Sequence, residues 1–309
     1  MKVLITPRSF GKYNLEEMDK LFKNENIEYV TNPYGRILTE EEMIKELEDV
    51  DGIIVGIDPL NEKVLSHAKK LKAIAKYGVG VDNIDMKYCE EHNISVSRTL
   101  GANSNAVADY AFALLMSLSR RVVEINNKCK EGDWSKKVSL DTYGKKIGVI
   151  GLGAIGKGVV RRASGFDMEI YGYDLYKDQD FIDEYKINFT DVETIIKECD
   201  FISLHLPLTS ETRHLINDTM LKKAKDNLII INTARGGLID EEALYQAIKN
   251  KEIYGAGLDV FDQEPPSESK LLELENVIVG SHTAASSIDA TKIMSEMATK
   301  NIIEDLIGE

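Results

Sequence analysis

Three polar side chains in the second half of the sequence could together bind an anion and move a proton. Arg235, Glu264 and His282 each follow a short apolar run. A guanidinium is a rigid two-pronged donor that matches a carboxylate. An imidazole exchanges a proton near neutral pH, and a carboxylate on its second nitrogen fixes the tautomer and raises the pKa of the imidazole. The residues therefore predict an anion anchor, an acid–base group and a residue that tunes it.

Each of these side chains also has a structural interpretation when it is taken singly. Arg235 then bridges two domains, His282 is a buried and satisfied histidine, and Glu264 is a solvated loop acid. The other histidines favour structural roles, although His205 stands at a strand end that approaches a ligand. No spacing of His, Cys, Asp or Glu indicates a metal site.

A glycine-rich turn precedes these residues and predicts a dinucleotide site. Gly151-Leu152-Gly153-Ala154-Ile155-Gly156 lies between the apolar run Ile147–Ile150 and a helical stretch. Gly151 permits the tight turn, Gly153 lets the backbone approach a pyrophosphate, and Gly156 lets helix and strand pack closely. The backbone groups of Ala154 and Ile155 then face the pyrophosphate at the helix N-terminus.

Asp174 follows the first glycine by roughly 20 residues, the spacing at which an acid accepts from ribose hydroxyls. A carboxylate there repels a 2′-phosphate, so we expect NAD rather than NADP. The structural alternative is a turn that serves only packing, with Asp174 as a solvated strand end.

Alternating apolar runs and amphipathic stretches position these residues. The first half predicts strands near residues 3–6, 27–30, 53–57, 71–77 and 94–96, with helices between them. The second half predicts six strands, at residues 147–150, 169–173, 201–204, 228–231, 255–260 and 277–279. Such alternation predicts parallel sheets, and ligands bind beyond the carboxyl ends of their strands. Arg235, Glu264 and His282 should therefore converge on one edge.

The pattern predicts two doubly wound α/β domains. A helix over Asn105–Arg120 connects them, the polar segment Lys128–Tyr143 is irregular, and the second series begins at Lys146. The final helix, Ser287–Ile307, has no strand after it and is expected to return to the first domain. Thr39 and Glu42 have the spacing of a capping box.

Composition narrows the classes of partner. The 309 residues carry a net charge of −14, which disfavours nucleic acid and anionic membrane surfaces. No apolar stretch reaches the length of a membrane span, and the first residues predict a strand instead of a signal peptide. Cys89, Cys129 and Cys199 are widely spaced and suggest neither disulfides nor zinc. We expect a cytoplasmic protein.

The sequence resembles the D-2-hydroxyacid dehydrogenases, the family that includes D-3-phosphoglycerate dehydrogenase, over nearly all its length. The matching segments are Tyr77-Gly78-Val79-Gly80-Val81-Asp82-Asn83-Ile84-Asp85, Val149–Gly156, His205-Leu206-Pro207-Leu208-Thr209, Asn232–Asp240, Leu258–Pro266 and Gly280-Ser281-His282. The resemblance implies a Rossmann NAD-binding domain at residues 103–283 and a flavodoxin-like substrate domain at residues 1–102 and 284–309. It also implies a homodimer, with the segment around Trp134 as its arm.

The same resemblance implies roles for individual residues. Arg235, Glu264 and His282 correspond to the catalytic trio, and Val79 and Gly80 to backbone donors for the substrate carboxylate. Asp259 corresponds to the residue that holds the nicotinamide carboxamide. The further cofactor contacts are His205, Pro207, Thr209, Thr212, Thr233 and Ala234, together with Arg235 and His282.

The implied activity is reversible hydride transfer between NAD and a small anionic 2-hydroxy or 2-oxo acid. His282 takes the hydroxyl proton, Arg235 holds the carboxylate, and domain closure excludes water. The first expectation is oxidation of 3-phosphoglycerate by a short form without the regulatory domain. The alternatives are a reductase of the glyoxylate or hydroxypyruvate class and a non-catalytic NAD-sensing regulator. A methyltransferase would leave the trio unexplained.

Departures from the family pattern bear on the substrate. Asp109 replaces a usual Glu, and Thr283-Ala284-Ala285 replaces a glycine-containing run. The segment Gly56-Ile57-Asp58-Pro59-Leu60 lacks the Arg and Ser with which typical phosphoglycerate dehydrogenases hold phosphate. Arg8, Arg36 and Arg98 either replace that phosphate site or are surface cations.

Overall fold

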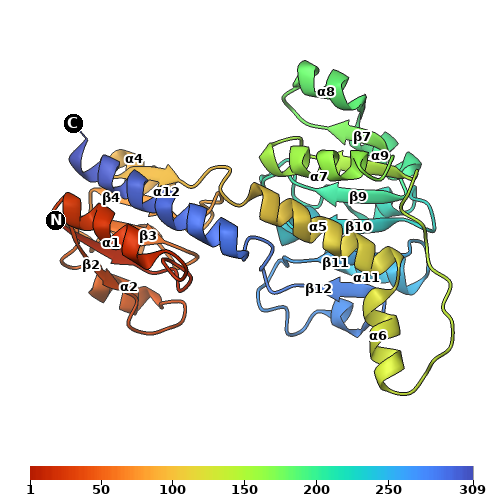
Figure 1. Ribbon diagram of the computed structural model, residues 1–309, viewed down its shortest axis with the longest axis horizontal. Helices are drawn as coiled ribbons and strands as arrows, with labels where there is room; N and C mark the ends of the chain where they lie inside the picture. The colour runs from red at the N-terminus through yellow and green to blue at the C-terminus, as the bar shows by residue number, and fades with distance from the viewer. Residues whose placement is uncertain (309) are drawn as a thin grey trace. The chain divides into compact units, whose positions relative to one another are not determined.

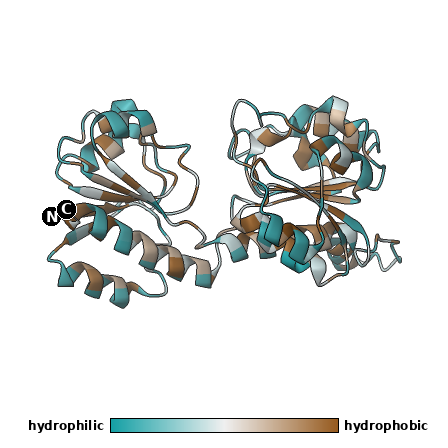
Figure 2. Ribbon diagram, turned by 90° about the horizontal axis from the view of Figure 1, so that it is seen from above, coloured by the Kyte–Doolittle hydropathy of each residue, from teal (hydrophilic) through white to brown (hydrophobic). Residues whose placement is uncertain are grey.

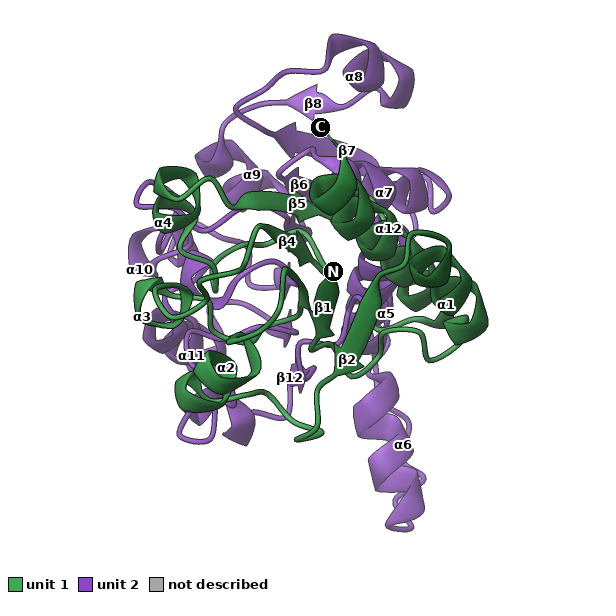
Figure 3. Cartoon of the chain, turned by 90° about the vertical axis from the view of Figure 1, so that its left-hand side faces the viewer, with its two compact units in different colours: residues 1–103, 286–309 green, residues 104–285 purple. Residues whose placement is uncertain are grey.

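The computed structural model describes residues 1–308, and they form two α/β units (Figures 1 and 3). Unit 1 consists of Met1–Asn103 and the segment that begins at Ser286, while unit 2 is Ser104–Ala285. The family resemblance implied the corresponding boundaries after residues 102 and 283. None of the helices in this described chain combines the length and apolar character that crossing a bilayer requires.

Unit 1 is a five-stranded parallel sheet with helices on both faces. The strand order is β2-β1-β3-β4-β5, which is the flavodoxin-like order expected for this unit. Its elements are β1 (Lys2–Ile5), α1 (Leu15–Asn24), β2 (Glu28–Thr31), α2 (Glu40–Glu46), β3 (Gly52–Val55), α3 (Glu62–Leu65), β4 (Ala73–Lys76), α4 (Met86–Glu91), β5 (Ser95–Arg98) and α12 (Ile288–Ile307).

Local sequence signals explain where these helices begin. The capping box at Thr39 is present, with its hydroxyl accepting from the Glu42 N–H at 3.3 Å and the Glu42 carboxylate accepting from the Thr39 N–H at 2.9 Å. Ser287 caps α12. This helix packs with α1 against one face of the sheet, while α2, α3 and α4 cover the other. The last helix therefore completes the core of unit 1.

Unit 2 is a seven-stranded parallel sheet in the order β12-β11-β10-β9-β6-β7-β8. The chain runs outward from β6 in both directions, which is the doubly wound Rossmann arrangement. Its elements are α5 (Ser104–Ser119), α6 (Val122–Lys130), β6 (Lys146–Ile150), α7 (Ala154–Ser164), β7 (Glu169–Tyr173), α8 (Gln179–Tyr185), β8 (Asn188–Phe189), α9 (Val192–Glu198), β9 (Phe201–Leu204), α10 (Asp218–Leu221), β10 (Ile229–Asn232), η1 (Gly236–Leu238), α11 (Glu241–Lys249), β11 (Gly255–Leu258), η2 (Lys270–Glu273) and β12 (Val277–Val279).

The prediction of six strands for this half was wrong by one. The additional strand, β8, has two residues, pairs with β7 at the edge of the sheet, and is too short to show a hydrophobic period. The segment expected to be irregular also begins inside a helix, because α6 extends to Lys130. Neither difference moves the strands that carry the candidate site.

Two apolar layers hold the unit 2 sheet, and the hydropathy colouring shows apolar strands between helices with polar outer surfaces (Figure 2). Helices α5, α7 and α8 cover one face, and α9, α10 and α11 cover the other. Asp109, one of the departures from the family pattern, accepts from Arg162 Nε at 2.7 Å and so links α5 to α7. The carboxyl ends of β6, β9, β10 and β11 share one edge of this sheet.

Candidate active site

The three glycines of the turn meet three different surroundings. Gly151 has a φ of +100°, and a Cβ on it would lie 2.6 Å from the His205 carbonyl. A Cβ on Gly156 would lie 1.9 Å from the Gly151 oxygen, so this glycine permits the close packing of α7 on β6. A Cβ on Gly153 would meet no atom within 4 Å, and this residue stands immediately before α7. The open glycine is thus the one predicted to face the pyrophosphate.

Ala154 and Ile155 form the first turn of α7, which has no side-chain cap at Gly153. Helix N-termini bind phosphate through such N–H groups and the helix dipole. The geometry of the turn fits a dinucleotide.

Asp174 lies at the end of β7 and holds the turn in place. Its Oδ2 accepts from the Leu152 N–H at 2.6 Å, and its Oδ1 accepts from the Tyr176 N–H at 2.9 Å. Each carboxylate oxygen can accept more than one hydrogen bond, so both retain capacity for ribose hydroxyls. Leu175 and Tyr176 are largely exposed beside it.

Two buried polar atoms with no protein partner lie at the same edge of the sheet as the turn. The atoms are Thr233 Oγ1 and His205 Nδ1. Thr233 directly follows β10 and His205 directly follows β9, and these two strands are neighbours in the sheet. A buried donor or acceptor left unpaired costs about 1–3 kcal/mol, so such atoms indicate a missing ligand or water. Together with the open glycine, they fit a bound cofactor at this edge.

His205 is unsuited to proton transfer at neutral pH. Its Nε2 lies 2.8 Å from Ser203 Oγ, and burial lowers the pKa of His205 to about 3. The ring is therefore neutral beside the cofactor turn. Ser203 is a partner that sequence reasoning missed, and its only signal is a polar residue inside the apolar run of β9.

The loop after β9 carries the other expected cofactor contacts. Thr212 Oγ1 donates to the Pro207 carbonyl at 2.7 Å and accepts from the Thr209 N–H at 2.8 Å. The Ala234 N–H donates to Asn232 Oδ1 at 3.0 Å. These hydrogen bonds fix the loop after β9 and the loop after β10. The cofactor roles of Pro207, Thr212 and Ala234 stay predictions.

His282 and Glu264 form the pair that the sequence predicted. His282 Nδ1 lies 2.8 Å from Glu264 Oε2. Burial raises the pKa of Glu264, but the hydrogen bond and charge of His282, the Phe261 N–H and Arg235 outweigh it and hold that pKa below its usual value. An ionised carboxylate only accepts, so Nδ1 of His282 carries the hydrogen and Nε2 remains for exchange with a ligand.

His282 itself has left-handed backbone, with a φ of 54°. That conformation costs about 1–3 kcal/mol for a side chain of this kind and persists only where neighbours impose it. Asp259 provides the constraint through three contacts. Its carbonyl accepts from the His282 N–H at 2.9 Å, and its carboxylate accepts from the Thr283 and Ala284 N–H groups at 2.9 and 2.8 Å.

Burial raises the pKa of Asp259 despite these backbone donors. The resemblance assigned this residue to the nicotinamide carboxamide. In the structure it also sets the loop that presents the histidine, and a Cβ on Gly280 would lie 2.1 Å from its Oδ1. Asp259 binds Thr283 and Ala284 through their backbone N–H groups, so these contacts do not require glycine at either position.

Arg235 lies just beyond β10, and its backbone is held by a residue that sequence reasoning missed. Asn232 is 1% exposed, and its Nδ2 donates to the Arg235 carbonyl at 2.8 Å. Arg235 Nη1 donates to the Ala234 carbonyl at 2.6 Å. The available signal for Asn232 was a polar residue directly after three isoleucines. Arg235, Glu264 and His282 all belong to unit 2.

The expected substrate contacts belong to unit 1. Val79 and Gly80 lie in the loop after β4, and Arg8 lies after β1, where its Nη1 donates to the Gly35 carbonyl at 3.5 Å. Arg36 forms a two-pronged pair with Glu42 at 2.6 and 2.8 Å. Arg98 is exposed at the end of β5. The Arg36 guanidinium donates both Nη groups to the Glu42 carboxylate, so the donors that would bind a phosphate are already used.

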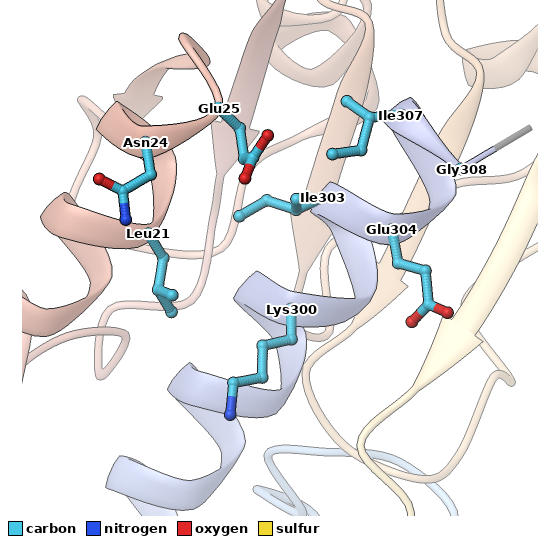
Figure 4. A pocket seen from close by; sticks show the side chains of 8 residues that line it. All are labelled: Leu21, Asn24, Glu25, Lys300, Ile303, Glu304, Ile307 and Gly308. Carbon is cyan, nitrogen blue, oxygen red and sulfur yellow. The ribbon is translucent and has the colours of Figure 1, made fainter.

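A cavity of about 460 Å³ in unit 1 is separate from these residues (Figure 4). It lies between α1 and α12 and is lined by Leu21, Asn24, Glu25, Lys300, Ile303, Glu304, Ile307 and Gly308. None of the predicted site residues lines it. Within residues 1–308, no group of three or more His, Cys, Asp or Glu residues could hold a metal ion.

Comparison with known protein families identifies the family to which this chain belongs. Residues 112–284 match the model of the family described as "D-isomer specific 2-hydroxyacid dehydrogenase, NAD binding domain". The chain belongs to this family. Its fold and the likeness of its unit 2 to an NAD-binding domain make it an NAD-dependent D-2-hydroxyacid dehydrogenase.

Named relatives of this dehydrogenase share most of its length. It is 42% identical to a glyoxylate reductase from Korarchaeum cryptofilum, over 86% of this chain and 83% of that protein. It is 38% identical to a hydroxypyruvate reductase from Thermotoga maritima, over 94% and 95%. A D-3-phosphoglycerate dehydrogenase from Methanocaldococcus jannaschii is 41% identical over 88% of this chain but 53% of its own length.

Solved structures agree with the family. The TT0316 protein from Thermus thermophilus superposes with a TM-score of 0.90 at 34% identity and covers 100% of this chain and 98% of its own. A D-lactate dehydrogenase from Aquifex aeolicus, complexed with NAD and lactic acid, has a TM-score of 0.83 at 30% identity, over 96% and 93%. The expectation of an NAD-dependent oxidoreductase is confirmed, and so is the fold class.

Proposed function

We propose that this dehydrogenase reduces a small 2-oxo acid of the glyoxylate or hydroxypyruvate class. The observation that carries the proposal is the His282–Glu264 pair at 2.8 Å. Arg235 contributes to the low pKa of Glu264, so the guanidinium acts on the same group of residues. An acid–base group and a cation at one sheet edge suit a ligand that has a carboxylate next to a carbonyl.

A nicotinamide cofactor held at the glycine turn, Gly151–Gly156, would supply the hydride for C2 of the 2-oxo acid. In this proposal His282 gives its Nε2 proton to the carbonyl oxygen, and in the reverse direction it takes that proton from the hydroxyl. Glu264 stabilises the protonated ring, and Arg235 holds the carboxylate and the developing negative charge. One 2-oxo acid, one hydride and one proton thus give one 2-hydroxy acid.

Two observations favour a small acid over 3-phosphoglycerate, the substrate that was expected first from the sequence. Two relatives that match over 83% and 95% of their own length are named for glyoxylate and hydroxypyruvate. Arg36 is paired with Glu42, and the loop after β3 carries the buried Asp58 in place of a cation. A phosphate would leave only Arg8 and Arg98 among the three arginines suggested for it.

A direct assay tests this choice. Glyoxylate, hydroxypyruvate and 3-phosphohydroxypyruvate are compared with NADH and NADPH, and 3-phosphoglycerate with NAD. We expect kcat/KM for the best small acid to exceed that for the phosphorylated acid by about 100-fold, the discrimination of a few kcal/mol that an unpaired phosphate gives. A higher value for the phosphorylated acid, reduced by Arg8→Ala, would support the phosphoglycerate activity instead.

We also propose that the segment after α6 joins two copies of the chain. Trp134 is 81% exposed and Val138 is 90% exposed, and no residue of α6 is buried. Large exposed apolar side chains grouped on one segment mark an interaction surface. Trp134→Ser with Val138→Ser should convert a dimer to a monomer in light scattering, whereas a wild-type monomer would contradict the proposal.

A further inference from the structure

A buried lysine stands at the end of β4, next to the loop that holds Val79 and Gly80. Lys76 is 5% exposed, and its ammonium donates to the Gly56 carbonyl and, at 2.7 Å, to Asn83 Oδ1. Burial of an ammonium is costly unless acceptors surround it, so the buried charge of Lys76 depends on these two hydrogen bonds. They connect the loop after β3 to the loop after β4.

Asn83 strengthens the same connection from the far end of the loop. Its Nδ2 donates to the Asp58 carbonyl at 2.6 Å and to the Gly56 carbonyl at 3.2 Å. The Asn83 carbonyl accepts from the Leu60 N–H at 2.8 Å. Lys76 and Asn83 therefore both donate hydrogen bonds to the Gly56 carbonyl in the loop after β3.

The loop between these residues is held at its ends and open in its middle. At the first end, the Gly78 N–H donates to Thr99 Oγ1 at 2.8 Å, and Gly78 has a φ of 142°. Across residues 1–308, no protein acceptor is found for the N–H groups of Val79 and Gly80. Their direction thus depends on the anchors on either side.

We propose that Lys76 is a positioning residue for the substrate carboxylate. By fixing Asn83 and the β3 loop, it aims the Val79 and Gly80 N–H groups at a monocarboxylate, and its charge favours an anion there. Lys76 Cε lies 3.8 Å from where a Cβ on Gly78 would be, so the cation is adjacent to the loop. This inference rests on the proposed function and names the group that orients its substrate.

Lys76→Met tests the inference because it retains a long apolar side chain and removes the ammonium. The matched control is Lys72→Met, just before the amino end of the same strand, where the ammonium lies 3.8 Å from Asp51. We expect KM for hydroxypyruvate to rise about tenfold in Lys76→Met, with kcat within about threefold. The Kd for NADH should not change, because the cofactor turn belongs to unit 2. The control should match the wild type.

Asn83→Ala provides a second variant if Lys76→Met does not fold. It should raise KM similarly, and the double variant should do no more than the larger single change, because both act through one network. Titration of oxamate into the enzyme–NADH complex gives the same comparison without turnover. Unchanged KM and oxamate affinity in either folded variant, or additive effects, would overturn the inference. Wild-type enzyme inactive on all small 2-oxo acids would instead count against the proposed function.

Discussion

The carboxyl edges of the two sheets differ in whether they also carry partly exposed polar side chains that can titrate. In unit 1, Thr6, Asp58 and Lys76 are buried and bond one another or loop backbone. In unit 2, Glu264 and His282 are partly exposed and keep atoms free for a ligand. The comparison indicates that one edge shapes backbone donors while the other carries the groups that titrate. Changes to Glu264 or His282 should therefore lower kcat, and changes to Lys76 should raise KM.

The largest effect should come from the group that moves the proton. His282→Ala should lower kcat by about 10²–10⁴, the usual contribution of a positioned acid–base group. The Kd for NADH should stay within about twofold, as measured by fluorescence titration. His67→Ala, at an exposed histidine of unit 1, is the control. If His282→Ala kept most of its turnover, the division between the two edges would fail.

Glu264→Gln should lower kcat by about 10- to 100-fold and shift its pH profile. The pKa of Glu264 is held low by His282, so the carboxylate is ionised throughout a neutral assay range. Loss of that charge removes the carboxylate that stabilises the protonated ring, and reduction needs the protonated ring. The decline in kcat with rising pH should consequently begin at a lower pH than in the wild type. An unshifted profile would show that Glu264 does not tune His282.

A pair of glycine substitutions should separate ligand binding from packing within unit 2. Gly153→Ala meets open space, so it should weaken NADH binding about tenfold while Tm stays unchanged. Gly156→Ala places a Cβ 1.9 Å from the Gly151 oxygen and should lower Tm as well. Equal losses of Tm in the two variants would contradict the assignment of Gly153 to the pyrophosphate.

A separate effect, on stability instead of catalysis, is a pH dependence that comes from His205. Its folded pKa, about 3, lies below the ordinary value of 6.5, so the unfolded chain binds more protons between these values. The contribution is fully present above pH 6.5 and is lost as pH falls through this window, by up to about 1.4 kcal/mol per pH unit. Denaturant unfolding at several pH values should show a shallower slope in His205→Gln. An identical slope would show that the neutral ring contributes nothing to this dependence.

Roles that follow from a motif or from a position at a strand end could be predicted from the sequence. Roles that depend on contact with a residue far away in the sequence could not. The spaced glycines and the strand ends pointed to the turn and to Arg235, Glu264 and His282. Their contacts had to be observed, since only the folded chain brings Glu264 within 2.8 Å of His282.

Buried polar partners gave little signal in the sequence. Asn232 and Lys76 are each the last residue of an otherwise apolar strand, and many polar residues end strands without forming a network. The acceptors of Lys76 lie on two other segments, Gly56 and Asn83, so its function emerges only from tertiary structure. The edge strand β8 was missed because two residues cannot show a period.

The return of α12 to unit 1 has a consequence for biosynthesis. A Cβ on Gly52 would lie 3.0 Å from Ile302, so the middle of the first sheet packs directly against the last helix. During translation, unit 2 is complete in sequence before that helix leaves the ribosome, and until then α1 alone covers this apolar face of unit 1. The nascent chain thus carries a partly open sheet face while all of unit 2 is synthesised, and apolar surface exposed in this way is what chaperones bind.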